Sequence, residues 1–143
     1  MKKYINTKQI GNITELECML SFIRLGYNVL TPYGDCERYD FVVDVNNKFY
    51  KIQSKTAYSE DNGKSFIIAT KSSNRKNGKS VIRKYTNKEI DYFVTFFNNK
   101  CYLIPVEECG VQKKLRIAPT MNGQNNNICW AKNYELEEVI KSL

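Results

Sequence analysis

The sequence contains no histidine among its 143 residues. This absence excludes every site that depends on an imidazole, including Ser-His-Asp and Cys-His nucleophile pairs, two-histidine metalloprotease sites and histidine-metal nuclease motifs. Any catalysis by this chain must therefore use carboxylates, lysine, tyrosine, cysteine or a hard metal ion.

Long apolar runs and paired cysteines are also missing. No apolar stretch approaches the roughly 20 residues of a membrane span, and the N-terminal segment lacks the apolar run of a signal peptide. We expect a soluble, intracellular protein with no membrane partner. The five cysteines are an odd number without a CxxC pair, so we expect reduced, mostly buried thiols. The length predicts one hydrophobic core and a single domain over residues 1–143.

The chain is strongly basic. A net charge of +7 and a pI of about 9.1 favour a polyanionic partner, because clustered Lys and Arg release counterions from phosphates. A second explanation remains open, since 17 of the 22 basic residues are lysine and 16 residues are asparagine, a composition that an A/T-rich genome produces for any function.

The apolar spacing predicts a mixed α/β (α+β) chain. Two-residue turns at Asn46-Asn47 and Asn98-Asn99, each between alternating segments, predict hairpins over 39–55 and 91–105. The other expected elements are a helix over 13–25, strands over 27–32 and 64–70, a mobile loop or flap over 71–84, a mostly irregular segment over 110–133, and a terminal helix that begins after Asn133 and buries Leu136, Val139, Ile140 and Leu143.

The first of these helices carries a glutamate on the side expected to face the core. Helical spacing places its apolar positions in one arc, and Glu15 lies within that arc whereas Glu17 lies nearly opposite, in solvent. The apolar positions are Ile13, Leu16, Met19, Leu20, Phe22 and Ile23. An inward Glu15 is either part of a site or one half of a salt bridge to Lys51 or Arg38.

The first hairpin has a defined register if Asn46-Asn47 forms its turn. Val45 then opposes Lys48, Phe41 opposes Ile52, and Asp40 opposes Gln53. Residues opposite each other share a face, and Lys55 lies on the same face two residues further along. The alternative is that these polar residues are simply the solvent side of an amphipathic hairpin.

A converging Asp40, Gln53 and Lys55 would suit phosphodiester hydrolysis without histidine. Such a reaction calls for a divalent ion that activates water, and Mg²⁺ prefers oxygen ligands, with Mn²⁺ as a substitute. The candidate metal ligands are the side chains of Asp40, Gln53 and Glu15 and the backbone carbonyl of Ser54, while Lys55 is the candidate electrostatic catalyst.

The same residues carry a resemblance to a known family. A helix glutamate, a segment from Pro32 to Asp40 and a Gln53-x-Lys55 strand resemble the PD-(D/E)xK nuclease superfamily, with Gln in place of the last carboxylate. The chain is similar in particular to the small Gln-x-Lys group that includes intron-encoded homing endonucleases. Further matching positions are Gly11, Gly26-Tyr27, Arg38-Tyr39, Thr56, Asp91-Tyr92-Phe93, Tyr102, Ile104-Pro105, Leu115-Arg116 and Trp130-Ala131.

The resemblance implies a restriction-endonuclease-like fold with a central mixed sheet flanked by helices. It also implies a metal-dependent DNA endonuclease that forms a homodimer or higher homo-oligomer, acting either as a site-specific homing or restriction-like enzyme or as a Holliday junction resolvase on branched DNA. The replacement of a carboxylate by Gln53 weakens metal binding in principle, so a nucleic-acid-binding module that has lost cleavage stays as an alternative. A protein-binding factor from a mobile element is a third possibility.

Basic residues outside the motif are candidates for DNA contact. The segment 71–84 carries six of them and no acid, interleaved with Ser and Asn as in segments that follow phosphates. A solvated loop is the competing interpretation, and it is favoured for the amide-rich residues 124–127. The candidate DNA contacts are Lys71, Arg75, Lys76, Lys79, Arg83, Lys84, Lys113, Lys114 and Arg116.

Overall fold

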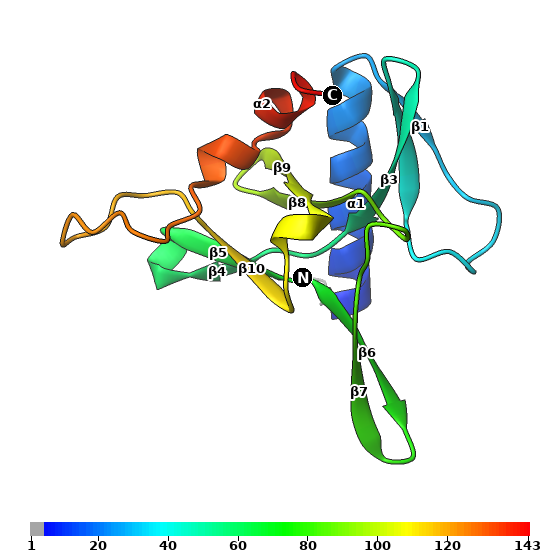
Figure 1. Ribbon diagram of the computed structural model, residues 1–143, viewed down its shortest axis with the longest axis horizontal. Coiled ribbons are helices and arrows are strands. Elements are labelled where there is room, and N and C mark those ends of the chain that lie inside the picture. Colours follow the sequence, from blue (N-terminus) through cyan, green and yellow to red (C-terminus); the bar gives the residue numbers. More distant parts are fainter. Residues whose placement is uncertain (1–4) are drawn as a thin grey trace.

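A central mixed sheet organises the fold in the computed structural model, which describes residues 5–143 (Figure 1). Its strand order is β1-β2-β3-β8-β9, and only the β3–β8 pair is parallel. The bounds are β1 Asn28–Leu30, β2 Phe41–Val45, β3 Lys48–Ser54, β8 Tyr92–Phe97 and β9 Lys100–Pro105. The expected central mixed sheet is confirmed.

The two faces of this sheet are covered by different kinds of element. On one face, Phe41, Val43 and Val45 pack against helices α1 (Thr7–Arg24) and α2 (Leu136–Ile140). On the other face, Phe93 and Ile104 pack against a second sheet of order β10-β5-β4. The strands of the second sheet are β4 Tyr58–Glu60, β5 Ser65–Ala69 and β10 Gln112–Arg116. Helices therefore flank the central sheet on one side only.

Both predicted hairpins form with the predicted turns. Asn46, Asn47, Asn98 and Asn99 have φ values of 52°, 66°, 49° and 62°, the left-handed conformation that two-residue hairpin turns require. In the β2–β3 ladder, Val45 pairs with Lys48 and Phe41 pairs with Ile52, so the predicted register is confirmed over β2.

Helix α1 begins six residues earlier than predicted and buries a different face. Asn6 caps it, because the Asn6 side chain accepts from the Gln9 backbone N–H and the Gln9 side chain accepts in return. The buried residues are Thr14, Cys18 and Phe22. The predicted apolar face was wrong except for Phe22 and the partly buried Met19, because small residues at Thr14 and Cys18 let the helix approach the sheet closely.

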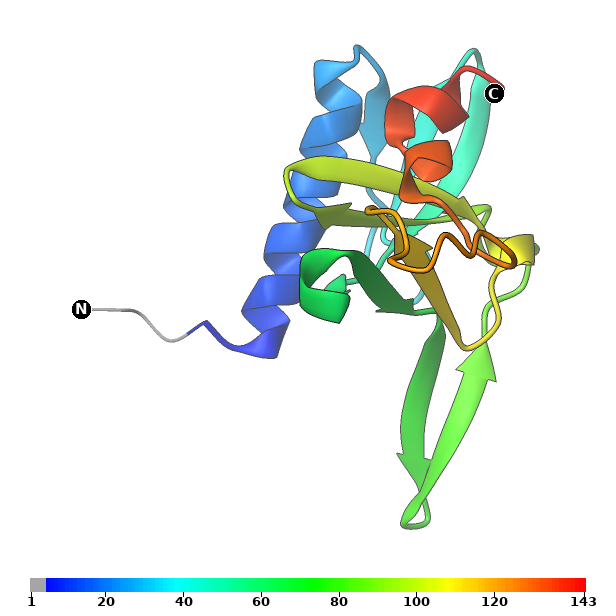
Figure 2. The same ribbon diagram turned by 90° about the vertical axis from the view of Figure 1, so that its left-hand side faces the viewer.

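Residues 71–84 form a β-hairpin, so the expectation of an irregular loop was wrong, while that of a flap stays a prediction. Strands β6 (Lys71–Lys76) and β7 (Lys79–Lys84) pair antiparallel around the turn at Asn77-Gly78, where both residues have positive φ. The hairpin projects away from the two sheets (Figures 1 and 2). The signal was present in the sequence, since Asn-Gly is the strongest short hairpin turn, but its strands lack apolar alternation.

The C-terminal third is also more ordered than predicted. Strand β10 lies within the segment expected to be irregular, and it pairs antiparallel with β5. Short 3-10 helices occupy Val106–Glu108 and Ala131–Tyr134 in this part of the chain, and a third occupies Asp61–Gly63. Helix α2 begins at Leu136, with Glu135 and not Asn133 at its N-cap. Within residues 5–143, no helix is long and apolar enough to cross a membrane.

Candidate active site

Asp40 is the last residue of the loop that precedes β2. Its backbone N–H donates to Ile52 O at 2.8 Å, and its carboxylate oxygen Oδ2 accepts from Ser54 N at 2.8 Å. The residue therefore bridges to the end of β3 with both backbone and side chain. The predicted pairing of Asp40 with Gln53 is replaced by this bond to the next amide, and it fixes the carboxylate beside the Gln53-Ser54-Lys55 segment.

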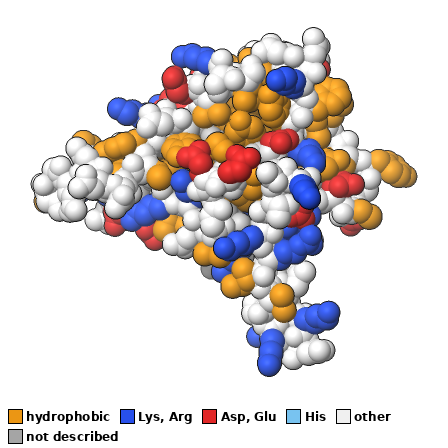
Figure 3. Space-filling model, in the orientation of Figure 1, with side chains coloured by type: hydrophobic (Ala, Val, Ile, Leu, Met, Phe, Trp, Pro, Cys, Tyr) orange, Lys and Arg blue, Asp and Glu red, His pale blue; other side chains and the backbone are white. Residues whose placement is uncertain are grey.

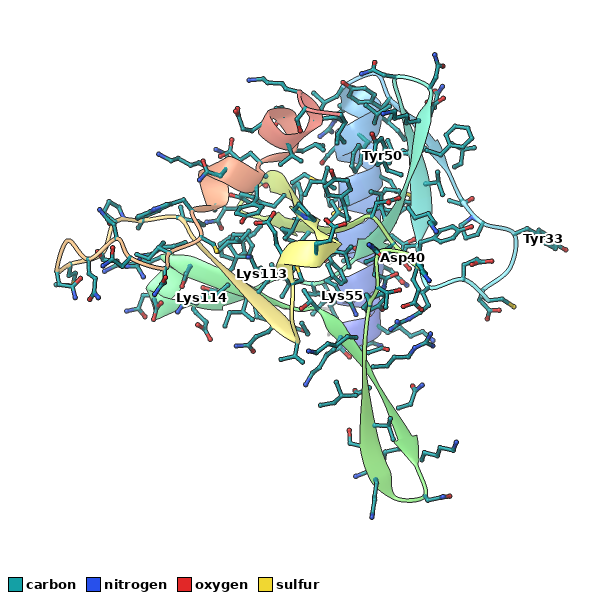
Figure 4. The ribbon with its side chains drawn as sticks, in the orientation of Figure 1. Tyr33, Asp40, Tyr50, Lys55, Lys113 and Lys114 are labelled. Carbon is teal, nitrogen blue, oxygen red and sulfur yellow. The ribbon has the colours of Figure 1, made fainter. Side chains whose placement is uncertain are left out.

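Lys55 directly follows β3. Its backbone N–H donates to Val94 O at 2.9 Å, which extends the parallel pairing of β3 with β8. Its ammonium donates to Lys71 O at 3.2 Å, at the first residue of hairpin β6–β7. Figure 4 shows Asp40 and Lys55 in the same region, where that hairpin leaves the sheets.

Glu15 approaches the same region from α1. It is half-buried, and burial and then the charge of Asp40 raise the pKa of Glu15. The expected alternative, a salt bridge from Glu15 to Lys51 or Arg38, does not form in the described chain: Arg38 pairs with Glu89, and the Lys51 ammonium donates to Lys88 O. Glu17, expected in solvent, is also half-buried.

Gln53 and Ser54 complete the predicted set. The Gln53 side chain is half-buried and makes only a long contact from Nε2 to Ser54 O, at 3.5 Å. Neither its Oε1 nor the Asp40 Oδ1 accepts a hydrogen bond from any residue of the described part of the chain. Two side-chain oxygens beside Lys55 are thus left open to a ligand.

Burial is the main influence on the pKa values of these groups. Burial raises the pKa of Asp40, although the Ser54 amide and the Lys55 ammonium oppose that rise. Burial and then the charge of Asp40 raise the pKa of Glu15. Burial lowers the pKa of Lys55, and Arg38 adds to this effect while Asp40 opposes it. Each charged form is therefore less favourable here than in water.

Two residues that sequence reasoning did not assign a role, Arg38 and Tyr85, connect the site to the hairpin. The Arg38 guanidinium stacks on the Tyr85 ring with 3.7 Å between its central carbon and the ring centroid, and the Lys55 ammonium lies 5.0 Å from the same centroid. Arg38 also donates to Lys84 O at 2.8 Å and to Ser72 Oγ at 2.7 Å. Only the match of Arg38 to the family pattern signalled its importance.

The predicted DNA-contacting residues fall into two groups. Along the hairpin, Lys71, Arg75, Lys76, Lys79 and Lys84 form no ion pair within residues 5–143, and only Arg83 is paired, with Glu89. In Figure 3 the hairpin shows Lys and Arg side chains and no acidic ones.

The other group, on β10, is largely neutralised by acids. Lys114 contacts Glu60 at 3.1 Å and Asp61 at 2.9 Å, and Arg116 lies 3.7 Å from Asp61. Lys113 donates to Glu108 O at 3.2 Å and lies above the Tyr134 ring. Of these two groups, the hairpin therefore carries more unpaired positive charge. The amide-rich residues 124–127 are exposed and lie in a turn or in irregular structure.

Comparison with known proteins decides the family. The profile of the PD-(D/E)XK endonucleases matches residues 5–137. The chain belongs to the PD-(D/E)XK endonuclease family. Among solved structures, a bacterial homing endonuclease, I-Ssp6803I, superposes with a TM-score of 0.77 at 20% sequence identity, covering 96% of this chain and 95% of that one. No curated protein matches the chain. The predicted family and its restriction-endonuclease-like fold are confirmed, and the nuclease function follows from the family.

In this PD-(D/E)XK endonuclease, the sequence prediction puts Asp40 in the place of the first aspartate and Gln53-Ser54-Lys55 in that of (D/E)XK. The structure joins these two segments through the 2.8 Å hydrogen bond from Ser54 N to Asp40 Oδ2. The substitution of Gln removes one negative charge but keeps an oxygen donor. Within residues 5–143, no group of three or more Asp, Glu, Cys and His side chains lies together. The acidic part of the site is thus the pair Asp40 and Glu15.

The donor set of this endonuclease suits a hard divalent cation. The two carboxylates, the Gln53 amide oxygen and the Ser54 carbonyl are oxygen ligands, and none of these donors is a thiol or an imidazole that would favour a softer metal. A cation between Asp40 and Glu15 would also offset the repulsion by Asp40 that adds to burial in raising the pKa of Glu15.

Proposed function

We propose that this chain, as one domain over residues 1–143, is a metal-dependent endodeoxyribonuclease whose active site lies where β2 begins and β3 ends. The observation that carries the proposal is that Asp40 and Lys55 lie near each other. The Asp40 Oδ2 atom accepts a hydrogen bond of 2.8 Å from Ser54 N, next to Lys55, and the charges of Asp40 and Lys55 influence each other's pKa. The nuclease family supports it.

The ligands of the metal would be Asp40, Glu15, Gln53 Oε1 and the Ser54 carbonyl. Bound Mg²⁺, or Mn²⁺ as a substitute, would lower the pKa of a water and neutralise charge on the phosphate. Asp40 and Glu15 must both be ionised to bind it, because only carboxylates match a double positive charge. Gln53 supplies a neutral oxygen and makes the two carboxylates more important than in a site with three acids.

Lys55 is the proposed electrostatic catalyst. In the reaction, a water oxygen bonds to phosphorus, the bond from phosphorus to the leaving oxygen breaks, and the nucleophile's proton passes to solvent. The ammonium of Lys55 stabilises the extra negative charge that develops on the phosphate oxygens. The hydrogen bond from Nζ to Lys71 O and the Tyr85 ring hold the ammonium in place, so it needs no reorganisation during the reaction.

The β6–β7 hairpin is the proposed DNA-binding arm. A two-stranded β-ribbon fits the major groove of B-DNA, and its unpaired cations match the phosphates that border the groove. Side chains alternate between its faces, with Ser73, Arg75 and Ile82 on one and Asn74, Lys76 and Val81 on the other. One face can therefore meet base edges while basic residues at its borders contact the backbone.

A homodimer or higher homo-oligomer is part of the proposal, because one subunit holds one site and a duplex has two strands. The homing endonuclease whose fold this chain shares favours a site-specific target on double-stranded DNA over a branched junction. The second candidate function is a DNA-binding module without cleavage, favoured by Gln53 in the position of a carboxylate.

The test is nicking and linearisation of supercoiled plasmids that carry candidate targets, in EDTA and across a titration of Mg²⁺ and Mn²⁺. We expect cleavage only with metal, and loss of cleavage in Asp40→Asn and Glu15→Gln. Tight DNA binding without cleavage in either metal would establish the binding module instead. Cleavage in EDTA would contradict the metal-dependent site.

A further inference from the structure

Arg38 holds the base of the β6–β7 hairpin, next to the candidate active site. Its terminal nitrogen Nη1 donates to Lys84 O at 2.8 Å, and its Nη2 donates to Ser72 Oγ at 2.7 Å. Nη2 also donates to Arg83 O at 3.5 Å. Ser72 pairs with Arg83 in the ladder, so one guanidinium contacts both strands of the hairpin where it leaves the sheets.

The first cross-strand pair of the hairpin, Lys71 with Lys84, is contacted by two cations. The Lys55 ammonium donates to Lys71 O at 3.2 Å, and the Arg38 guanidinium donates to Lys84 O. Both cations also lie near the Tyr85 ring, at 3.7 Å for the central carbon of Arg38 and 5.0 Å for Lys55 Nζ from the ring centroid. Arg38 and the proposed catalyst are therefore connected through one pair of residues and one ring.

The position of the Lys55 ammonium depends on this hairpin base. Within residues 5–143, Lys71 O is its one hydrogen-bond acceptor, and it forms no ion pair with Asp40. The hairpin in turn is not fixed by buried side chains of its own, because every residue from Ser73 to Lys84 is exposed. Polar contacts at its base therefore determine where both the hairpin and the ammonium lie (Figure 4).

Arg38 is itself held from the side of the central sheet. Glu89 Oε1 accepts from Arg38 Nη1 at 2.9 Å and from Thr86 N at 3.1 Å. The segment that carries Glu89 is attached to β3, since Asp91 N donates to Lys51 O and Asp91 Oδ2 accepts from Lys51 N, both at 2.8 Å. Arg38 thus links the hairpin to the strand that ends at the active site.

We propose that Arg38 is a positioning residue of the nuclease, which fixes the hairpin base and the Tyr85 ring and, through them, the ammonium of Lys55. The proposal rests on the function proposed above, in which Lys55 is the electrostatic catalyst. A catalytic cation must be in place before charge develops on the phosphate. Misplacement by about 1 Å can cost on the order of 10²-fold in rate, so the contacts of Arg38 matter although it does not touch the substrate.

Direct contact of Arg38 with DNA is the competing role, and its surroundings argue against it. Each terminal nitrogen already donates twice, and the side chain is 16% exposed. A guanidinium has five N–H groups, so little donor capacity is left for a phosphate. Lysine could not take over the positioning role, because an ammonium has three donors and no plane that stacks on a ring.

The experiment is a double-mutant cycle of Arg38→Met and Lys55→Met, measured as single-turnover cleavage of bound DNA with Mg²⁺. We expect Arg38→Met to slow cleavage about 10- to 30-fold when Lys55 is present. In the Lys55→Met background it should slow cleavage by less than about twofold, because Arg38 acts through Lys55. DNA affinity should change by less than about threefold, since the exposed cations of the hairpin remain. Equal losses of rate in both backgrounds, or a loss of affinity as large as the loss of rate, would overturn the proposal.

Conservative variants separate positioning from charge. Arg38→Lys keeps the charge and should be as slow as Arg38→Met, so a wild-type rate in Arg38→Lys would overturn the role of the guanidinium. Tyr85→Phe keeps the ring and should cleave at least about tenfold faster than Tyr85→Leu, and equal rates would overturn the role of the ring. Arg24→Met removes an exposed charge from the end of α1 and is the matched control, with an unchanged rate.

A measurement without cleavage separates failure of this proposal from failure of the nuclease. In protein labelled with ¹³C at the lysine Cε atoms, the ring current of Tyr85 shifts the NMR signal of Lys55, which Lys55→Met identifies. Arg38→Met and Arg38→Lys should move this signal towards those of exposed lysines, whereas Arg24→Met should not, and Tm verifies that each variant is folded. A signal that stays in place in both Arg38 variants overturns the positioning role. A signal that moves in a chain that cuts no DNA with either metal supports the positioning role and overturns the nuclease alone.

Discussion

Two hairpins in this molecule have the same turn chemistry and opposite surroundings. Asn46-Asn47 closes β2–β3 and Asn77-Gly78 closes β6–β7, each with positive φ at both turn residues. In β2–β3, every second residue of Phe41–Val45 is buried in the core. In β6–β7, every residue from Ser73 to Lys84 is exposed. Turn residues are thus enough to form a hairpin in both places, and the pattern of apolar side chains determines whether its strands pack into the core.

The difference matches what each hairpin is proposed to do. Catalytic groups need positions fixed to within a fraction of an ångström, and a buried strand pair provides them. A DNA-binding arm must enter a groove, so it has to stand free of the core. The two are joined at the base of the arm, where Lys55 donates to Lys71 O and Arg38 donates to Lys84 O.

The largest effect is expected at the buried hairpin. Lys55→Met keeps the apolar stem and removes the ammonium, so the cleavage rate should fall by roughly 10²- to 10³-fold, while DNA affinity changes by less than about threefold. Single-turnover cleavage and fluorescence anisotropy measure the two quantities. Lys48→Met, on the same strand but exposed near its turn, is the control and should cleave normally.

A cleavage rate unchanged by Lys55→Met would mean that the active site does not lie at the end of β3. Equal reductions of affinity and cleavage would instead place Lys55 with the DNA-binding residues, and the division of labour between the two hairpins would be wrong.

A smaller effect on cleavage and a larger one on affinity are expected at the free hairpin. Arg75, Lys76 and Lys79 are exposed and form no ion pair within the described residues, so changing all three to Gln should weaken DNA binding on the order of 10²-fold at moderate salt. The slope of log K against log salt should fall by about 0.9 for each phosphate that the variant no longer neutralises. Tm should stay within about 1 °C because no buried side chain changes.

Three exposed lysines at the opposite end provide the matched control. Lys48, Lys132 and Lys141 changed to Gln remove the same net charge from the region of the β2–β3 turn and α2 (Figure 1). Lys141 differs from the hairpin residues in contacting Glu138 at 3.3 Å, so a second control changes Lys48 and Lys132 alone and is compared with a variant that changes only Arg75 and Lys79. If both triple variants lose affinity equally, net charge and not the hairpin accounts for binding.

Sequence reasoning succeeded where one local rule decided the structure. Two asparagines between alternating segments were enough for the β2–β3 and β8–β9 turns, and the β2–β3 register followed because each residue's face depends on it. Placing Asp40 beside the Gln53-Ser54-Lys55 segment required only this register. The family pattern then supplied Glu15, which no local rule connects with β2.

Sequence reasoning failed where two rules competed. On α1, the larger aliphatic residues were assigned to the core, but the smaller Thr14 and Cys18 are buried and Leu16 is exposed. Periodicity cannot distinguish the buried face of a helix from its exposed face when both are apolar. The contacts of Arg38 join residues 34 and 46 positions apart in the chain, and no pattern in a single sequence encodes such long-range contacts.

The cost of holding two acids in the buried site can be measured as stability. Burial raises the pKa of Asp40, and burial and then the charge of Asp40 raise the pKa of Glu15, so the folded chain binds protons more tightly than the unfolded chain at these groups. The sites therefore favour folding at low pH, and this contribution is lost as pH rises from the unfolded pKa through the raised one. At pH 7 without metal, Asp40→Asn should raise Tm.

The gain in Asp40→Asn should shrink as pH falls towards 4, and Mg²⁺ should raise the Tm of the wild type but not that of the variant. Asp44→Asn, on the same strand opposite Phe49, is the control and should show neither effect. A lower Tm for Asp40→Asn at pH 7 would mean that the hydrogen bond from Ser54 N to the Asp40 carboxylate contributes more stability than burial of its charge costs. The ionised Asp40 would then stabilise the folded chain.

The smallest effect is expected on β10, where the basic residues differ from those of the free hairpin in already having acidic partners. Lys114 contacts both Glu60 and Asp61, so it has little charge to offer a phosphate, and Lys114→Gln should change DNA affinity by less than about twofold. Lys79→Gln, at an unpaired residue, should reduce the salt slope by about 0.9. Anisotropy titrations at several salt concentrations compare the two single variants directly. Equal changes in slope would mean that DNA displaces the acids from Lys114 and that the binding surface runs from the hairpin onto the second sheet.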